Sequence, residues 1–201
     1  SLSEENGKPV IGVHITDTSF FIPPDGEIDR AGLLRGTTVY LPRGKLPMLP
    51  SALSEDKASL VAGLDRPSLS FFASLDETGQ PQLERIRQSV IRVGRRLSYQ
   101  EADSLLSAAG TDAYTSALQQ LSSLAQLRKA WRLANGAVII EGPEIKVRVA
   151  DTDIHVSLLS NDSPARSLVG ECMILANEIA ARYCHRHTLP ALYSAQPPPD
   201  E

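Results

Sequence analysis

The sequence predicts a mixed α/β fold, in which a mixed sheet packs against several helices. Three observations predict it. Residues 9–15 are apolar on both alternating faces, as in a covered central strand. Residues 66–75 and 83–93 alternate as strands around an Asp-Glu-Thr-Gly turn, which is typical of a hairpin. Residues 165–187 carry apolar side chains at helical spacing, which predicts a long packed helix.

The first strand leads directly to a carboxylate. By strand alternation, Ile11, Val13, Ile15 and Asp17 share one face, so Asp17 lies at the edge of a buried surface. A carboxylate in that position needs a cation or hydrogen-bond donors. Residues 29–35 then predict two helical turns that end at Gly36.

Capping signals place the remaining helices. Ser98 and Glu101 have capping-box form and should start a helix that ends near Gly110. A second helix is expected over residues 112–134, because Asn135-Gly136 would stop it. Short strands are expected over residues 137–140, 145–149 and 154–159, before the helix over residues 165–187, whose apolar stripe is Leu168, Cys172, Leu175, Ile179 and Tyr183.

Composition limits the function classes. The 201 residues are 42% hydrophobic, which is ordinary for a globular chain, and we find no domain boundary. The net charge of −4 lacks the basic excess of most nucleic-acid binders. Cys172 and Cys184 lie on one expected helix about 18 Å apart, too far for a disulfide. Unpaired thiols and the lack of a membrane-spanning run favour the cytoplasm or an organelle interior.

The usual catalytic and metal motifs are absent. His14, His155, His185 and His187 have no zinc-ligand spacing with either cysteine. No phosphate-binding glycine loop and no G-x-S-x-G element occurs.

Several motifs nevertheless occur in a familiar order. Residues 11–50 read IGVHITDTSFFIPPDGEIDRAGLLRGTTVYLPRGKLPMLP, followed by SEDKASLVAGLDR, SVIRVGRRLSYQEA, the Asn135-Gly136-Ala137 landmark before Glu144, and ECMILANEIAAR. This order resembles the catalytic (RNB) domain of the ribonuclease II family over essentially the whole chain. That family reads approximately V-x-I-A-D-V-S, then T-x-Y-L-P and I-P-M-L-P, then E-F-M-L-L-A-N.

The resemblance implies a hydrolytic, magnesium-dependent 3′→5′ exoribonuclease that releases 5′-nucleoside monophosphates from single-stranded RNA. Family members keep their magnesium ligands in an aspartate cluster that would lie upstream of Ser1, and an essential arginine motif further downstream. We therefore expect residues 1–201 to be a partial catalytic domain without catalytic residues or metal ligands of its own. The segment alone should hydrolyse RNA negligibly.

Five residues are expected to contact RNA. The resemblance makes Tyr40 the clamp for the terminal nucleotide and Glu171 a contact to a sugar. An aromatic face can stack on any base, and a carboxylate can accept from a 2′-hydroxyl. Asp17 either orients a cationic or metal-bound group or caps the following turn. Arg35 either holds phosphate or pairs with Asp29, and Arg92 belongs to a basic strand that either follows a phosphate backbone or is a solvated face.

Two other interpretations stay open. The chain could belong to a non-catalytic RNA-binding relative, whose aspartate cluster has decayed. It could also be a protein-interaction domain, which the acidic balance favours. The sequence indicates no oligomeric state.

Overall fold

The computed structural model describes residues 1–108, 110, 112–139, 144–150, 153–159 and 163–193. In chain order the elements are β1 (Leu2–Glu5), β2 (Lys8–Thr16), the short 3₁₀ helix η1 (Thr18–Phe20), α1 (Glu27–Arg35), β3 (Val39–Leu41), β4 (Gly44–Leu46), the π-helical turn η2 (Ala52–Lys57), β5 (Asp65–Leu75), β6 (Pro81–Arg92), α2 (Tyr99–Ser107), α3 (Ala113–Ala134), β7 (Glu144–Ala150), β8 (Asp153–Leu159) and α4 (Pro164–Arg186).

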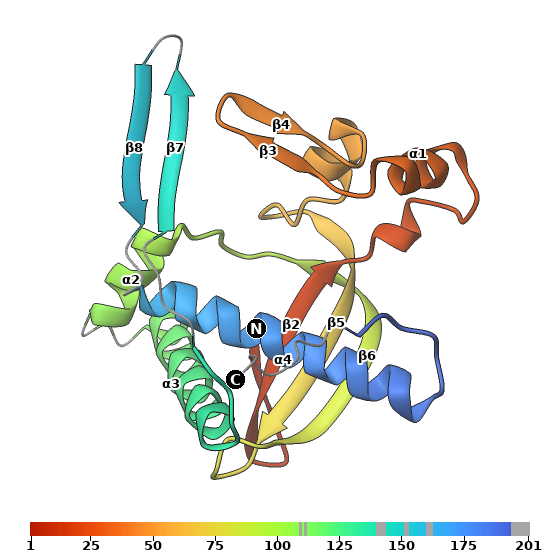
Figure 1. Ribbon diagram of the computed structural model, residues 1–201. Coiled ribbons are helices and arrows are strands. Elements are labelled where there is room, and N and C mark those ends of the chain that lie inside the picture. Colours follow the sequence, from red (N-terminus) through yellow and green to blue (C-terminus); the bar gives the residue numbers. More distant parts are fainter. Residues whose placement is uncertain (109, 111, 140–143, 151–152, 160–162, 194–201) are drawn as a thin grey trace, which may run out of the picture.

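The main sheet has four strands in the order β1-β2-β5-β6 (Figure 1). All its strand pairs are antiparallel, with Val13 opposite Phe71 in the central ladder. The mixed α/β class is confirmed, and β2 is flanked on both sides as expected. The one parallel pairing in the described part of the chain is an isolated bridge between Ala62 and Val93, so the main sheet is antiparallel rather than mixed.

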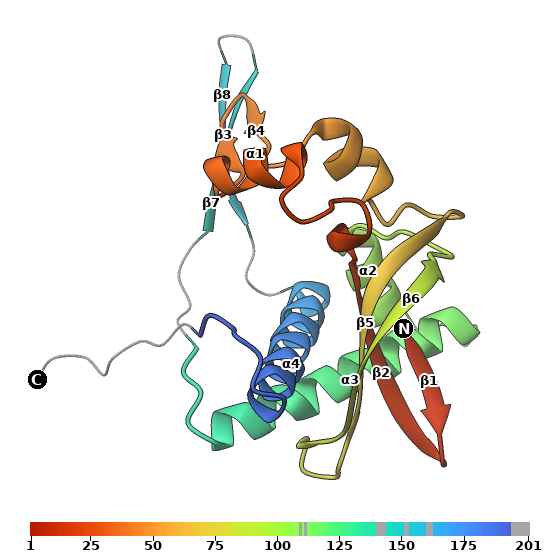
Figure 2. The ribbon, with the colours of Figure 1, turned by 90° about the vertical axis from the view of Figure 1, so that its right-hand side faces the viewer.

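One face of the sheet carries the apolar core. Ile11 of β2 and Phe71, Ala73 and Leu75 of β5 are buried there. Helix α4 packs against this face, and α3 covers the same core (Figure 2). The alternation of apolar residues along β2 and β5 therefore fixes which face receives the helices. The helical contribution to the core comes from Leu121, Leu124, Leu175, Ala176 and Ile179.

The opposite face of the sheet buries polar groups. Ser68 and Ser70 are fully buried, and Ser89 Oγ lies 2.5 Å from Ser70 Oγ and 3.0 Å from Ser68 Oγ. The His14 ring extends this network, with Nδ1 2.7 Å from Ser70 Oγ. Burial is the main reason that the pKa of His14 lies below its usual value, which keeps the ring neutral. Mutual hydrogen bonds thus satisfy the polar groups of this face.

Local signals set the helix ends. The capping box at Ser98 and Glu101 is present, and Gly36 ends α1 with a φ of +67°. Helix α3 ends at Ala134 because Gly136 turns the chain with a φ of +89° and Ala137 N–H bonds back to the Arg132 carbonyl. This closure explains why residues 137–139 form no strand. Ile140, the end of that expected strand, lies outside the described residues.

The turn between β5 and β6 packs against α3. Asp76 Oδ1 accepts from the backbone N–H groups of Thr78 and Gln80. Gly79 has a φ of +96°, and a Cβ there would lie 2.6 Å from the Leu127 carbonyl oxygen. Only glycine allows this approach between hairpin and helix.

Two small ribbons, β3–β4 and β7–β8, stand away from the main sheet (Figures 1 and 2). They meet where Val149 N–H donates to the Pro42 carbonyl at 3.2 Å. A pocket of about 450 Å³ lies at this junction, between Leu41 of β3 and Ile154 of β8. The expected strands over residues 145–149 and 154–159 are thus confirmed as one hairpin.

The cysteines and the apolar stripe of α4 can also be compared with their predictions. Cys172 and Cys184 are both free, as expected. The apolar stripe of α4 ends at Ile179, because Tyr183 is exposed and its ring contacts His187. Among the described helices, none is both long and apolar enough to cross a bilayer.

Candidate nucleic-acid interface

Asp17 lies where β2 ends and the chain turns into η1. Its Oδ1 accepts from the Ser19 N–H at 3.1 Å and the Ser19 hydroxyl at 2.5 Å, so it caps η1. Its Oδ2 accepts from Gln88 Nε2 at 3.4 Å. The capping alternative is therefore observed, and the half-buried carboxylate is supplied by neutral donors rather than by a cation.

A pocket of about 400 Å³ lies directly beyond Asp17. Thr18 and Ser19 form one wall, α1 contributes Gly32 and Leu33, and Met48 with Leu49 closes it. A Cβ added at Gly32 would lie 3.3 Å from the Leu49 side chain, so the packing here is tight. The pocket is thus lined by three consecutive parts of the chain: the turn after β2, helix α1 and the Met-Leu-Pro loop.

Arg35 holds the loop of this pocket in place. Its Nη1 donates to the Met48 carbonyl at 3.1 Å, while the Met48 N–H donates to Thr38 Oγ1 at 3.0 Å. No ion pair between Arg35 and Asp29 is found among the described residues, and the Asp29 carboxylate accepts from the Asp25 N–H. Arg35 is exposed as a residue.

Tyr40 lies in the middle of β3, two residues beyond Thr38. Its pairing partner across the ribbon is Lys45 of β4. The side chain is 79% exposed, so an external base could stack on its ring. Tyr40 is therefore not part of the packed core.

Arg92 ends β6 and forms an exposed ion pair. Its Nε and Nη2 donate to the two Asp65 oxygens at 2.7 and 2.9 Å, directly across the β5–β6 ladder. Arg85, in the same basic strand, pairs with Glu5. Two arginines of this strand therefore form ion pairs with carboxylates. This agrees with the interpretation of the basic strand as a solvated face rather than as a contact to phosphates.

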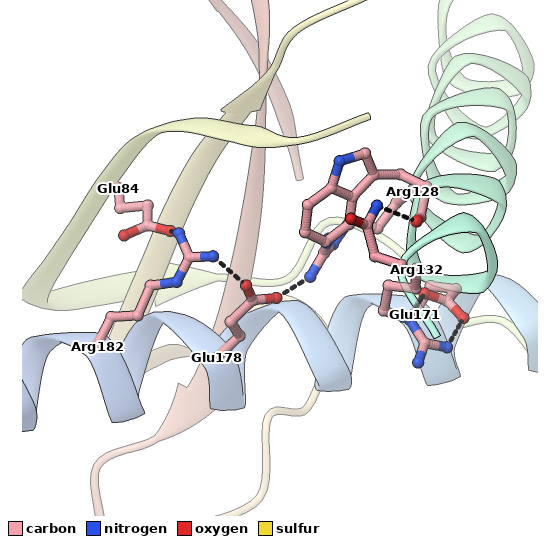
Figure 3. Close-up of polar contacts among 8 residues, drawn as sticks. Glu84, Arg128, Arg132, Glu171, Glu178 and Arg182 are labelled. Atoms are coloured by element: carbon pink, nitrogen blue, oxygen red, sulfur yellow. Dashed lines mark hydrogen bonds and ion pairs between the residues drawn. The ribbon is translucent and has the colours of Figure 1, made fainter. Parts of the chain in front are cut away.

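Glu171 does not face a cleft, contrary to the expectation from its helical position. It is 5% exposed, and both its oxygens accept from Arg132 of α3, at 3.0 Å from Nε and 2.6 Å from Nη2 (Figure 3). The carboxylate raises the pKa of the Arg132 guanidinium, as a close bidentate pair should. A role for Glu171 in binding sugar stays a prediction, and this arrangement gives it no support.

Further ion pairs continue along the contact between α3 and α4. Arg128 pairs with Glu178, which also pairs with Arg182, and Arg182 reaches Glu84 of β6 at 2.8 Å (Figure 3). Arg128 is 1% exposed, and its Nε and Nη1 have no partner among the described residues. Its guanidinium lies 4.7 Å from the Trp131 ring centroid, and burial lowers its pKa.

Two of the five expected contact residues lie at one end of the main sheet. Asp17 N–H bonds to the Pro67 carbonyl near the start of β5, two residues from the Asp65–Arg92 pair. Arg35 and Tyr40 lie on the segment between β2 and β5, which also supplies the pocket residues Gly32 and Met48, and neither of them lines the pocket itself. Glu171 lies apart from them, in the contact between α3 and α4.

The described residues do not form a metal site. No three His, Cys, Asp or Glu side chains among them lie together as metal ligands. The Asp17 oxygens already accept from Ser19 and Gln88.

Comparison with known proteins identifies the family. The model of the RNB domain matches residues 1–201, the whole chain. The chain belongs to the RNB family. Mouse (Mus musculus) exosome complex exonuclease RRP44 is 34% identical over 201 residues, which is 96% of this chain and 21% of that protein.

Solved structures share the fold. RNase R of Mycoplasma genitalium, in complex with ribose-methylated single-stranded RNA, superposes with a TM-score of 0.85 at 22% identity, covering 93% of this chain and 30% of that one. Yeast Ssd1, described as a pseudonuclease, gives a TM-score of 0.70 at 22% identity, covering 92% of this chain and 23% of that one. The chain thus spans less than a third of each of these relatives, and it has the RNB fold.

Sequence reasoning missed two features of this region. The sequence patterns predicted neither β3, which carries Tyr40, nor its partner β4. The Arg-Gly-Lys turn between them was the available signal. Arg132, the partner of Glu171, lies 39 positions away, and no local pattern indicates that pairing.

Proposed function

We propose that this chain is the RNA-holding part of a hydrolytic, magnesium-dependent 3′→5′ exoribonuclease, which releases 5′-nucleoside monophosphates from single-stranded RNA. The observation that carries the proposal is the exposed side chain of Tyr40, in a chain of the RNB family. The likeness to nucleases supports it as well.

Three residues have roles in this proposal. Tyr40 stacks on a base without regard to sequence, because every base offers a flat apolar face. Arg35 holds the Met48 loop through one donor and offers its remaining donors to phosphate. Asp17 fixes the turn that forms the pocket wall.

The direction of β1 supports metal ligands upstream of the chain. The Gly12 N–H bonds to the Ser1 carbonyl, and β1 runs antiparallel to β2. A segment that continues this ladder before Ser1 would pass beside Val13 to Thr16 and reach Asp17. Carboxylates there would hold magnesium next to the pocket, where the ion would activate water and stabilise charged oxygens. No catalytic step is assigned to residues of this chain.

The test uses the complete protein and a single-stranded RNA labelled at its 5′ end. We expect a ladder of products shortened from the 3′ end, with release of 5′-mononucleotides that stops when magnesium is chelated. Tyr40→Leu should weaken RNA binding by about tenfold, the loss of one stacked base. Tyr193→Leu is the matched control, since Tyr193 is also exposed and donates to the Ala181 carbonyl far from the pocket.

The second candidate is an RNA-binding protein without nuclease activity. Yeast Ssd1, which is described as a pseudonuclease, has the same fold, and this supports the second candidate. Tight RNA binding that depends on Tyr40, with no release of mononucleotides at any magnesium concentration, would support this candidate over the nuclease. Failure to bind RNA at all would instead favour a protein-interaction domain.

A further inference from the structure

Helix α2 lies between the N-terminal parts of α3 and α4, at the left of Figure 1. Asp103 of α2 accepts from the Ser163 hydroxyl at 2.7 Å and from the Ala165 N–H at 2.8 Å, which joins α2 to the start of α4. Gln119 of α3 donates to the Ala108 carbonyl at 2.9 Å, which joins α3 to the end of α2. These bonds bring residues from three separate segments to one corner.

Arginine and tyrosine side chains pair at this corner. The Arg95 guanidinium lies 5.6 Å from the ring centroid of Tyr114, and the Arg166 guanidinium lies 4.7 Å from that of Tyr99. Both rings keep more than two fifths of their surface exposed. Arg96 is exposed beside Arg95. We refer to these five residues as the Arg–Tyr corner.

The carboxylates of the corner are engaged by helix N-termini. Glu101 accepts from the Ser98 N–H at 2.7 Å in the capping box, and Asp112 accepts from the Tyr114 and Thr115 N–H groups at 3.1 Å. Asp103 caps α4, as described above. Helix N-termini attract negative charge, so these acids are held by backbone rather than by arginine.

The arginines of the corner therefore keep their charge available. In the described part of the chain, no salt bridge involves Arg95, Arg96 or Arg166. The positive charge of Arg95 helps to lower the pKa of Glu101. The Glu101 carboxylate oxygen, however, accepts its hydrogen bond from the Ser98 N–H. By contrast, Arg85 and Arg92 of β6 are both paired with carboxylates.

We propose that the Arg–Tyr corner is a second contact surface for single-stranded RNA, separate from Tyr40 and the Asp17 pocket. Its arginines bind phosphates, and the free faces of Tyr99 and Tyr114 stack on unpaired bases. Interleaved cationic and aromatic groups suit a single strand, because its bases are accessible for stacking while its backbone is charged. This proposal rests on the proposed RNA-binding function.

The test compares two lengths of RNA on the complete protein. Ribose-methylated strands of 4 and 20 nucleotides are used, and binding is followed by fluorescence anisotropy over a range of salt concentrations. The short strand can occupy only the Tyr40 region, whereas the long strand can also reach the corner. The variant Arg95→Gln/Arg96→Gln/Arg166→Gln removes three charges, and Lys8→Gln/Lys129→Gln/Arg186→Gln removes three charges elsewhere as a matched control.

The triple corner variant should bind the 20-nucleotide strand at least tenfold more weakly, with binding of the 4-nucleotide strand unchanged. Each lost phosphate contact should reduce the slope of log affinity against log salt by about 0.7, so the slope should fall by about 2. The matched control should keep the wild-type slope. Tyr99→Leu/Tyr114→Leu should weaken binding of the long strand with little change in slope, because stacking releases no counterions.

Several results would overturn the inference. An unchanged salt slope and affinity for the corner variant, with its melting temperature intact, would remove the corner from the RNA path while leaving the Tyr40 proposal standing. A long strand displaced more readily by polyglutamate than by unlabelled RNA would assign the corner to an acidic protein segment. Wild-type protein that binds neither strand would refute the RNA-binding function itself.

Discussion

The substitution Glu178→Gln should destabilise the fold far more than its position on a partly exposed helix suggests. Glu178 is the carboxylate that pairs with Arg128, whose side chain is 1% exposed. The Arg128 Nε and Nη1 groups already lack partners among the described residues. Neutralising Glu178 would leave an uncompensated charge in the contact between α3 and α4.

An unpaired buried charge costs about 3–5 kcal/mol, against a total stability of about 5–15 kcal/mol for a domain. With a urea dependence of about 2 kcal/mol per molar, the unfolding midpoint should fall by roughly 2 M. Arg128→Met should cost less, because Glu178 keeps Arg182 as a partner. The double variant should therefore resemble Arg128→Met alone.

Equilibrium urea unfolding of the chain, followed by circular dichroism, measures these midpoints. Asp65→Asn serves as the control, since it breaks an exposed ion pair with Arg92 and should leave the midpoint almost unchanged. Equal effects of Glu178→Gln and Arg128→Met that add in the double variant would refute the reasoning. Such additivity would mean that neutralising Glu178 does not leave the buried charge of Arg128 without a partner.

Two further perturbations test the packing of the sheet. Gly79→Ala should lower stability by about 1–3 kcal/mol in thermal melts, because residue 79 has a positive φ and its new Cβ would clash with the Leu127 carbonyl. Gly94→Ala is the control, since a Cβ there meets open space and should have little effect. Equal melting temperatures of the two variants would contradict this prediction. Burial holds the pKa of His14 below its usual 6.5, so the unfolded chain takes up the proton first as the pH falls. Stability should thus be independent of this group above about pH 6.5 and decrease below it, and His14→Gln should flatten that part of a denaturation profile against pH.

Local sequence patterns determined most of the elements. The ends of α2 and α3 follow from Ser98 with Glu101 and from Asn135-Gly136, because these residues satisfy backbone groups within a few positions of themselves. The apolar residues on both faces of β2 likewise predicted its central place. Strand β1 was missed, although Asn6-Gly7, both with positive φ, carries the signal of a tight hairpin.

The candidate site was predictable in its parts. The motif order pointed to the RNB family, and Asp17 and Arg92 do lie at one end of the main sheet. Arg92 lies at the same end of the sheet, but the sequence pattern of its strand could not indicate that Arg92 forms an ion pair with Asp65. Cross-strand partners depend on register, which single-strand periodicity does not specify.

The order of its motifs thus indicated the family of this chain, and its capping residues and apolar patterns indicated the helix ends and the faces of the strands. All of these depend on residues close together in sequence. Only the tertiary structure decided that Glu171 is buried against Arg132, and that the described carboxylates form no ion pair with Arg95 or Arg166. Ion pairs join side chains that are distant in sequence. Which of them meet is set by how α3 and α4 cross over the sheet, and the charges of a sequence do not encode that crossing by themselves.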